Sequence, residues 1–185
     1  MMAMLNKITV HGRFQPPLHL NHWNYLSQAF ELAQKVVILI TNPDLNESSV
    51  AESIHRNKKE NNPFTYEERV QIFKAFFDAK GIPETRYEFQ PFDIVNEDAW
   101  EQVLDSGVPN LVNVYGEWSE KKLKKFQQHG LPVIQLTIPR LGDISGRNIR
   151  GILNQPLSFK EKRQRLIEAG YMPEAVEGLF KVLSL

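Results

Sequence analysis

Residues 12–22, GRFQPPLHLNH, decide the fold that the sequence predicts. They follow the apolar run Ile8-Thr9-Val10, which is typical of a strand, and they lead into residues 23–34, whose apolar spacing is typical of a helix. The stretch is therefore expected to lie on a strand-to-helix turn. At the carboxyl end of a parallel strand, such a turn presents free backbone N–H groups and the positive end of a helix dipole. Both favour the binding of phosphate.

The polar side chains of this stretch suit an anion as well. His19 and His22 are three residues apart near the helix start, so their imidazole N–H groups can point at the same anion. Arg13 adds a permanent planar charge, and Gly12 lets the backbone approach a ligand closely. A histidine pair alone is more typical of a surface pair or a helix cap. The glycine-arginine turn before it favours a phosphate site.

The stretch resembles the (H/T)xGH signature of the nucleotidyltransferase superfamily, in particular the GRFQP…HxGH form of nicotinamide-nucleotide adenylyltransferases. It departs from that form at Asn21, where the family usually has glycine, and by one additional residue within Pro17-Leu18-His19. The resemblance implies a Rossmann-like fold and an enzyme that transfers a nucleotidyl group from a nucleoside triphosphate.

Composition sets the class of protein. The chain has 185 residues, 42% of them hydrophobic, which is enough for one sizeable core. Its 22 basic and 22 acidic side chains cancel, which argues against a nonspecific nucleic-acid binder. The absence of cysteine excludes disulfides, thiolate catalysis and cysteine-ligated zinc. Neither a signal peptide nor a stretch of about 20 apolar residues is present, so a cytoplasmic protein with no membrane partner is expected.

A second motif occupies residues 62–69, NPFTYEER. Thr65 and Glu68 form a capping-box pattern that predicts a helix start, and capping boxes are usually structural. The string also resembles the NPFTxxER motif of the archaeal-type adenylyltransferases, which implies a role at the nucleotide site. The polar residues before it, 45–62, are expected to form a long loop or a partly helical excursion. Their basic cluster at 55–59 is either a solvated face or a lid over phosphates.

A third motif occupies residues 143–150, DISGRNIR. Ser145 is a natural helix N-cap, and Arg147 and Arg150 lie three residues apart on one side of the helix that follows. The combination predicts a local anion site in a chain with no net charge. It resembles the ISxTxxR signature of the superfamily, which implies a grip on the ATP phosphates, although Arg147 replaces the usual threonine.

Two further segments follow strands that the sequence predicts. Residues 93–100 resemble the family segment that holds the nicotinamide ring, so Trp100 is expected either to stack on a pyridinium or to pack in the core. Gly116 follows the fourth strand, at the point where the strand order of a doubly wound sheet reverses, and is expected to line the nucleotide together with Glu117 and Trp118. The lysines at 121, 122, 124 and 125 are expected to form a solvated face.

The sequence as a whole predicts one α/β domain over residues 1–185, a Rossmann-like fold with a five-stranded parallel sheet and C-terminal helices. The four strands after the first are predicted at residues 36–40, 87–90, 111–115 and 133–137. The helices at the end of the chain are predicted at residues 160–169 and 172–183.

The resemblance also implies three groups of site residues and no direct metal ligand. The catalytic group is Arg13, His19, His22 and Arg150. The group for ATP and its phosphates is Gly12, Phe14, Gln15, Gly116, Ser145 and Arg147. The group for the acceptor is Thr41, Arg69, Asp93, Asn96 and Trp100.

The activity that the resemblance implies is adenylyl transfer. The 5′-phosphate of a mononucleotide, foremost nicotinamide mononucleotide, attacks the α-phosphorus of ATP and expels pyrophosphate. The attacking group is already an anion, so neither a general base nor a covalent nucleophile is needed. Mg²⁺ is expected to accompany the ATP phosphates. The departures at Asn21 and Arg147 leave open another phosphorylated acceptor or a catalytically degenerate nucleotide-binding regulator. Relatives of this type commonly assemble, which leaves a homo-oligomer open.

Overall fold

The computed structural model describes residues 4–41 and 61–184, which form two compact units. The first unit contains residues 4–12, 24–41 and 84–140, and the second contains residues 13–23, 61–83 and 141–184. The basic cluster predicted at 55–59, and with it the predicted loop up to residue 60, lies outside the described residues. The expectation of a single domain over 1–185 stays a prediction.

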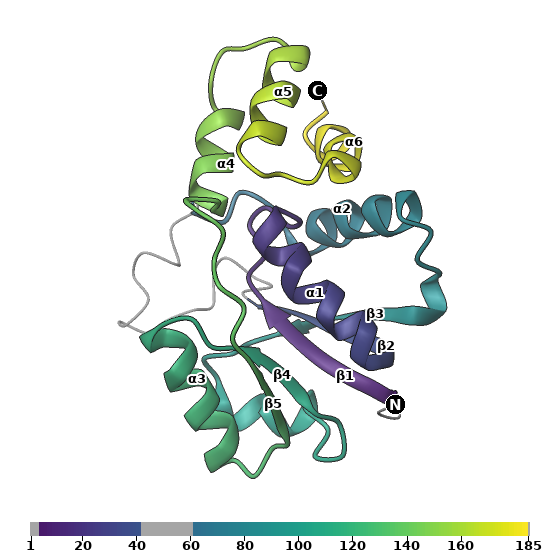
Figure 1. The fold of residues 1–185 in the computed structure, drawn as a ribbon, viewed down its shortest axis with the longest axis vertical. Helices are drawn as coiled ribbons and strands as arrows, with labels where there is room; N and C mark the ends of the chain where they lie inside the picture. The colour runs from purple at the N-terminus through teal and green to yellow at the C-terminus, as the bar shows by residue number, and fades with distance from the viewer. Residues whose placement is uncertain (1–3, 42–60, 185) are drawn as a thin grey trace. The chain divides into compact units, whose positions relative to one another are not determined.

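The first unit is built on a five-stranded parallel sheet (Figure 1). Its strands are β1 (Leu5–Gly12), β2 (Ala33–Thr41), β3 (Tyr87–Phe92), β4 (Asn110–Asn113) and β5 (Val133–Leu136). The strand order is β3-β2-β1-β4-β5, so the direction of winding reverses between β1 and β4. This confirms the predicted Rossmann-like fold, including the neighbouring first and fourth strands.

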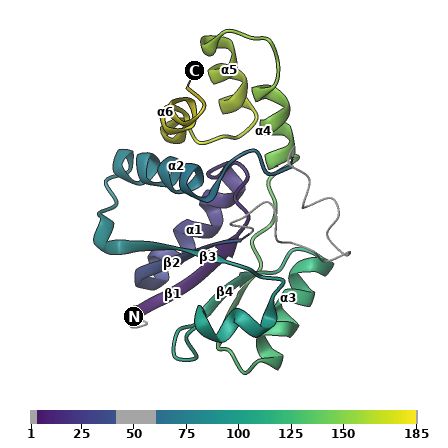
Figure 2. The same cartoon turned by 180° about the vertical axis from the view of Figure 1, so that it is seen from behind.

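Helical elements cover both faces of this sheet. Residues 24–32 of helix α1 (Leu20–Leu32) lie over one face, with Tyr25, Leu26 and Ala29 buried. The opposite face carries the 3-10 helix η4 (Glu97–Gln102) and helix α3 (Glu117–Gln128), which are seen from behind in Figure 2. The buried residues on that face are Val37, Leu39, Phe92, Trp100, Leu104, Val112 and Phe126. A second short 3-10 helix, η3 (Glu84–Arg86), precedes β3.

His11 is a buried polar residue inside this core. Its ring packs against Phe126 with 4.9 Å between centroids, and only 4% of the residue is exposed. Its Nδ1 lies 3.1 Å from Nζ of Lys122, which donates to it. Burial, followed by the charge of Lys122, holds the pKa of His11 well below its usual value near 6.5. Its place in the fold therefore favours the neutral form of His11.

The second unit is largely helical. Its helices are α2 (Tyr66–Ala79), α4 (Gly146–Leu153), α5 (Phe159–Glu168) and α6 (Pro173–Val182). Helix α2 begins with the predicted capping box, because the Thr65 hydroxyl accepts from Glu68 N–H while the Glu68 carboxylate accepts from Thr65 N–H. Helices α2 and α6 lie side by side (Figures 1 and 2), and Lys80 forms an ion pair with Glu174 between them at 2.5 Å.

The connection between α5 and α6 holds the histidine motif through backbone hydrogen bonds. Leu20 N–H donates to Gly170 O at 2.7 Å, and Met172 N–H donates to Leu18 O at 3.0 Å. Together these bonds make an isolated antiparallel bridge between His19 and Tyr171. The connection between α5 and α6 therefore fixes the backbone on both sides of His19.

The start of α4 lies very close to the loop that follows β1. A Cβ atom at Gly146 would lie 2.3 Å from the carbonyl oxygen of Gln15, which is closer than real Cβ contacts. Glycine is therefore required at this position for the approach to occur. Gly151, in the same helix, faces open space, since a Cβ there would meet no atom within 4 Å.

Acidification is expected to destabilise the protein through His11. The unfolded chain takes up a proton at this side chain near pH 6.5, whereas the folded protein does so only at lower pH. The free energy of unfolding therefore falls as the pH drops below about 6.5. Urea unfolding at pH 7.5 and 5.5 measures this, and His11→Asn should lose less stability between the two than the wild type. An equal loss in both proteins would contradict the assignment.

Substitution of Gly146 is expected to disturb the contact between α4 and the loop after β1. Gly146→Ala should lower the free energy of unfolding by about 1–3 kcal/mol, because the new methyl group must push the Gln15 carbonyl away. Gly151→Ala is the matched control, and it should raise stability by up to about 1 kcal/mol through helix propensity. Urea unfolding compares the two, and equal effects would show that the close approach is unimportant.

Candidate phosphate-binding site

The two histidines of the first motif are stacked. Their ring centroids are 3.5 Å apart, with an interplanar angle of 20°. Backbone N–H of His22 donates to Nδ1 of His19 at 3.3 Å, so in the neutral ring the proton of His19 resides on Nε2. Phe14 packs its ring edge-on against His22, with 5.0 Å between centroids. His22 N–H also donates to the carbonyl oxygen of His19 at 2.9 Å, and His19 is itself a buried residue, with 4% exposed. The contact to Nδ1 favours the tautomer in which His19 Nε2 is the donor.

Arg69 supports the backbone of the same loop from helix α2. Its Nη1 donates to the carbonyl oxygen of Arg13 at 2.7 Å, and its Nε donates to the carbonyl oxygen of Thr65 at 3.0 Å. The residue is fully buried, and burial, followed by the charge of Arg13, lowers the pKa of Arg69 to about 10. The resemblance implies acceptor contact for Arg69, but the structure gives it a supporting place within the protein.

Gln15 joins the first motif to the second. Its side-chain Nε2 donates to the carbonyl oxygen of Phe64 at 2.7 Å, and its Oε1 accepts from Phe64 N–H at 3.2 Å. Only 3% of Gln15 and 2% of Phe14 are exposed. The resemblance implies nucleotide contact for both residues, whereas the structure buries both side chains. Phe14 adopts φ +49° and packs on Phe73, so the two residues shape the loop from inside.

Arg150 joins the first motif to the third. Its Nη1 donates to the carbonyl oxygen of Gln15 at 2.5 Å, and its Nη2 donates to Oδ1 of Asn61 at 3.3 Å. Burial, followed by the charge of Arg147, lowers the pKa of Arg150. Ser145 is the N-cap of α4, as predicted, and its hydroxyl accepts from Asn148 N–H.

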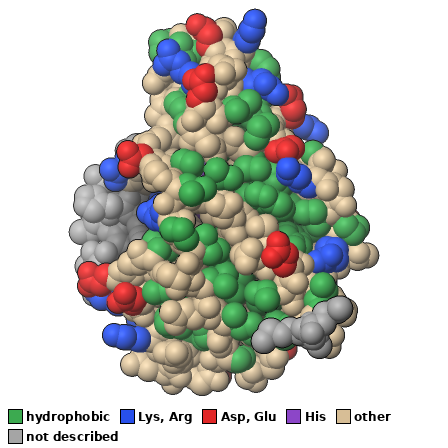
Figure 3. Space-filling view, viewed as in Figure 1, with side chains coloured by type: hydrophobic (Ala, Val, Ile, Leu, Met, Phe, Trp, Pro, Cys, Tyr) green, Lys and Arg blue, Asp and Glu red, His purple; other side chains and the backbone are tan. Residues whose placement is uncertain are grey.

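The three motifs therefore form one hydrogen-bonded assembly within the second unit. Segments 13–22, 61–69 and 141–150 are tied together by Gln15, Arg69 and Arg150. The assembly carries two histidines and four arginines beside three acidic residues, Glu67, Glu68 and Asp143, and it includes the positive end of α4. Helix α5, which lies outside the assembly, carries acidic and basic side chains interspersed along its sequence, and both kinds are seen on the surface in Figure 3.

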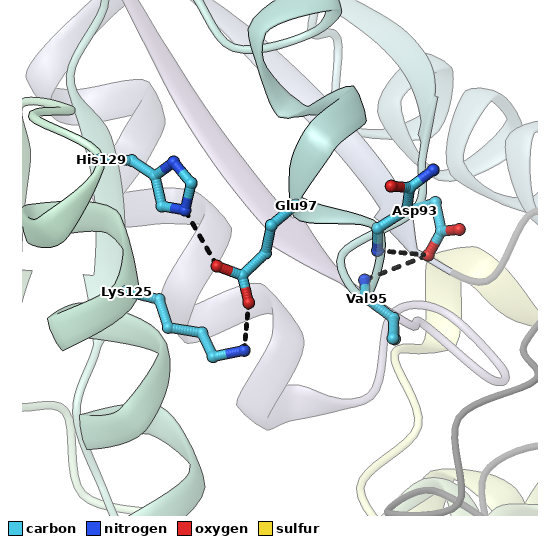
Figure 4. A network of polar contacts seen from close by, with 6 residues as sticks. Asp93, Val95, Glu97, Lys125 and His129 are labelled. Atoms are coloured by element: carbon cyan, nitrogen blue, oxygen red, sulfur yellow. Dashed lines mark hydrogen bonds and ion pairs between the residues drawn. The ribbon is translucent and has the colours of Figure 1, made fainter.

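The other predicted residues belong to the first unit, at the carboxyl ends of its strands. Gly12, Thr41 and Asp93 end or follow β1, β2 and β3 in turn. Thr41 is buried, whereas Asn96 is exposed. One carboxylate oxygen of Asp93 accepts from Val95 N–H at 3.0 Å and from Asn96 N–H at 3.4 Å (Figure 4). This turn directs the chain into η4.

Glu97 in η4 binds two basic side chains of the α3 region. Its carboxylate pairs with Lys125 and, at 2.9 Å, with His129 (Figure 4). Their hydrogen bonds hold the pKa of Glu97 below its usual value. The lysines of α3 are therefore not simply a solvated face, because Lys125 pairs with Glu97 and Lys122 reaches the buried His11.

Trp100 lies in the core of the first unit. Its ring packs on Phe126 at 4.9 Å, on His129 at 5.0 Å and on Phe92 at 6.0 Å between centroids, and only 2% of the residue is exposed. The sequence left stacking on a pyridinium and core packing open for this residue. The structure gives it the core position, with its ring surrounded by protein.

The turn after β4 exposes two aromatic rings. Gly116 is the N-cap of α3, and its N–H donates to Oγ of Ser119 at 3.1 Å. Tyr115 and Trp118, on either side, are 53% and 43% exposed. Arg140 lies over Tyr115 and Lys122 lies over Trp118, each 5.1 Å from the ring centroid.

The described residues also bear on metal binding and on membrane crossing. Within residues 4–41 and 61–184, no group of three or more His, Cys, Asp or Glu residues is placed to hold a metal ion. None of the helices in those ranges combines the length and the apolar character that a membrane crossing requires.

Comparisons with known proteins identify the family of the chain. The family model described as cytidylyltransferase-like matches residues 9–152, a range that contains all three motifs. A phosphonoformate cytidylyltransferase of Streptomyces viridochromogenes is 32% identical over 123 residues, or 66% of each chain. A nicotinamide-nucleotide adenylyltransferase of Thermococcus sibiricus is 28% identical over 151 residues, or 81% of this chain and 74% of the relative.

A solved structure shares the fold. It is a bifunctional NMN adenylyltransferase/ADP ribose pyrophosphatase from Francisella tularensis, with a TM-score of 0.66 and 17% identity. The alignment covers 98% of this chain but about half, 51%, of that one. The match to the Streptomyces relative likewise spans just under two thirds of its length. Because the family model matches residues 9–152, which are most of this chain, the chain belongs to the cytidylyltransferase-like family.

Proposed function

We propose that this nucleotidyltransferase moves the adenylyl group of ATP to the 5′-phosphate of a mononucleotide, foremost nicotinamide mononucleotide, and so forms NAD and pyrophosphate. The observation that carries the proposal is the stacked pair His19–His22, held in the same assembly as the positive end of α4. The choice of ATP and nicotinamide mononucleotide as substrates is supported by the likeness to the Thermococcus relative and by the GRFQPP motif.

The reaction is an in-line displacement at phosphorus. A phosphate oxygen of the mononucleotide forms a bond to the α-phosphorus of ATP, while the bond from that phosphorus to the bridging oxygen breaks and pyrophosphate departs. Holding the two phosphates in line supplies up to about 7–11 kcal/mol of the rate enhancement. Hydrogen-bond donors that meet the growing negative charge add to the rate enhancement. These donors are the side chains of His19, His22 and Arg147 and the first backbone N–H groups of α4.

The acceptor is expected at the first unit, and the metal is expected on the ATP phosphates. Ligands of doubly wound sheets bind at the carboxyl ends of the strands, which supports acceptor contacts at Thr41, Asp93 and Asn96 in the first unit. Mg²⁺ prefers oxygen ligands and retains several waters, so it is expected to arrive on the ATP phosphates. When bound, it would neutralise part of the triphosphate charge.

A second candidate is cytidylyl transfer from CTP to a small phosphorylated or phosphonate acceptor. It is favoured by the 32% identity to the phosphonoformate cytidylyltransferase. It is also favoured by the core position of Trp100, because the ring that was expected to stack on a pyridinium is surrounded by protein. The phosphate chemistry is the same in both candidates, so the histidine pair and α4 would serve either one.

Loss of His22 is expected to impair catalysis without unfolding the protein. His22→Ala should lower kcat about 10²- to 10³-fold, because a donor to the charged transition state is removed. His129→Ala is the matched control, since His129 pairs with Glu97 in the first unit, and it should leave turnover near the wild-type value. Release of pyrophosphate is the measurement. Unchanged turnover in His22→Ala would remove this residue from the mechanism.

An acceptor and donor screen distinguishes the candidates. ATP and CTP are each offered with nicotinamide mononucleotide, nicotinate mononucleotide and phosphonoformate, and pyrophosphate release is followed. We expect the highest kcat/KM with ATP and a pyridine mononucleotide. A preference for CTP with phosphonoformate would establish the second candidate instead. Tight nucleotide binding by calorimetry, with no pyrophosphate from any pair, would indicate a regulator that binds nucleotide without turnover.

A further inference from the structure

We infer that Asn21 is a positioning residue that fastens the entrance of helix α4 to the histidine motif and so sets where the α4 arm meets the nucleoside triphosphate; this inference rests on the proposed function. Asn21 stands between the two histidines of the first motif, directly before His22. The structure gives its side chain a set of contacts with the segment that precedes α4.

Both ends of the Asn21 carboxamide are engaged by one turn of backbone. Its Oδ1 accepts from Leu141 N–H at 2.8 Å. Its Nδ2 donates to the carbonyl oxygen of Ile144 at 3.0 Å and to that of Leu141 at 3.4 Å. The partners are 120 and 123 residues away in the chain, and all of them belong to the second unit. A carboxamide has one donor end and one acceptor end, and this turn matches both.

The contacts of Asn21 join the two motifs next to the residues that are proposed to bind phosphate. Asn21 is the residue before His22, and Ile144 is the residue before Ser145, the N-cap of α4. Movement of the 141–144 turn would therefore be passed directly to the helix start that carries Arg147. The side chain thus connects the two motifs that are proposed to bind the same triphosphate.

This tie is separate from the contact made by Arg150. Arg150 donates to Gln15 O, on the loop before the histidines, and it does so from the second turn of α4. Asn21 holds the segment that precedes α4, from the start of α1. Two ties at different points fix both the position and the direction of a short helix.

The first experiment measures binding and turnover in Asn21→Ala. We expect the KM for ATP, and the Kd for ATP by calorimetry, to rise about 5- to 20-fold, as for the loss of one or two hydrogen bonds to a positioned segment. The kcat and the KM for the mononucleotide should stay within about 2-fold. Asn154→Ala, at the exposed C-cap of α4, is the matched control and should bind ATP as the wild type does.

Asn21→Asp, which keeps the size of the side chain, separates the effect of the hydrogen bonds from the effect of side-chain volume. Asn21→Asp keeps an acceptor for Leu141 N–H but turns an oxygen towards the carbonyl groups of Ile144 and Leu141. It should therefore weaken ATP binding more than Asn21→Ala does. A double-mutant cycle with Arg147→Ala adds a direct test, because a residue acting through α4 should cost less binding once Arg147 is gone. Strict additivity would contradict action through the α4 arm.

Hydrogen exchange without nucleotide separates this inference from the proposed function. In Asn21→Ala, amides of residues 141–148 should exchange faster than in the wild type, while those of α2 should not change. If the wild type binds ATP and Asn21→Ala binds it equally well, the inference is overturned and the proposed function stands. If the wild type binds neither ATP nor CTP, the proposed function fails and takes this inference with it.

Discussion

The hydrogen bond from the Arg150 guanidinium to the backbone carbonyl of Gln15 is the contact on which the second unit depends. It joins residues 135 apart in the chain, and it is possible only because Gly146 has no Cβ to strike the same carbonyl. Arg69 makes the equivalent bond to the carbonyl of Arg13. Two largely buried guanidinium groups therefore hold the loop after β1 by its carbonyl oxygens, and a buried charge that lost these acceptors would be costly.

This arrangement also suits the triphosphate that the proposed function requires, in a chain of zero net charge. Carbonyl oxygens repel phosphate, and the loop's carbonyls at Arg13 and Gln15 are covered by arginines. The groups that the same assembly contributes are donors, namely the His19 Nε2–H and the first N–H groups of α4. The arginines thus have two effects. They fix the loop, and they occupy its carbonyl acceptors, so that the groups left to meet an anion are donors.

The sequence predicted the features whose signals are local. The five strands, the capping box at Thr65 and the N-cap at Ser145 follow from short-range patterns and are confirmed. The Rossmann-like order, which the alternation of strands and helices and the family resemblance implied, is confirmed as well. The bonds of Gln15 to Phe64 and of Asn21 to the 141–144 turn span 49 to 123 residues and leave no periodic trace in the chain. For the same reason the core position of Trp100 could not be separated from an exposed one. Burial in this case depends on Phe126, which another element supplies.

The most direct measurement of the central claim is a crystal structure with α,β-methylene ATP bound. The account predicts that the phosphate oxygens lie within hydrogen-bond distance of the His19 and His22 side chains and of the first N–H groups of α4, with Arg147 beside them. The Arg150–Gln15 bond should be intact in that complex. A triphosphate bound elsewhere on the chain, with the histidine pair and α4 making no contact to it, would contradict the account.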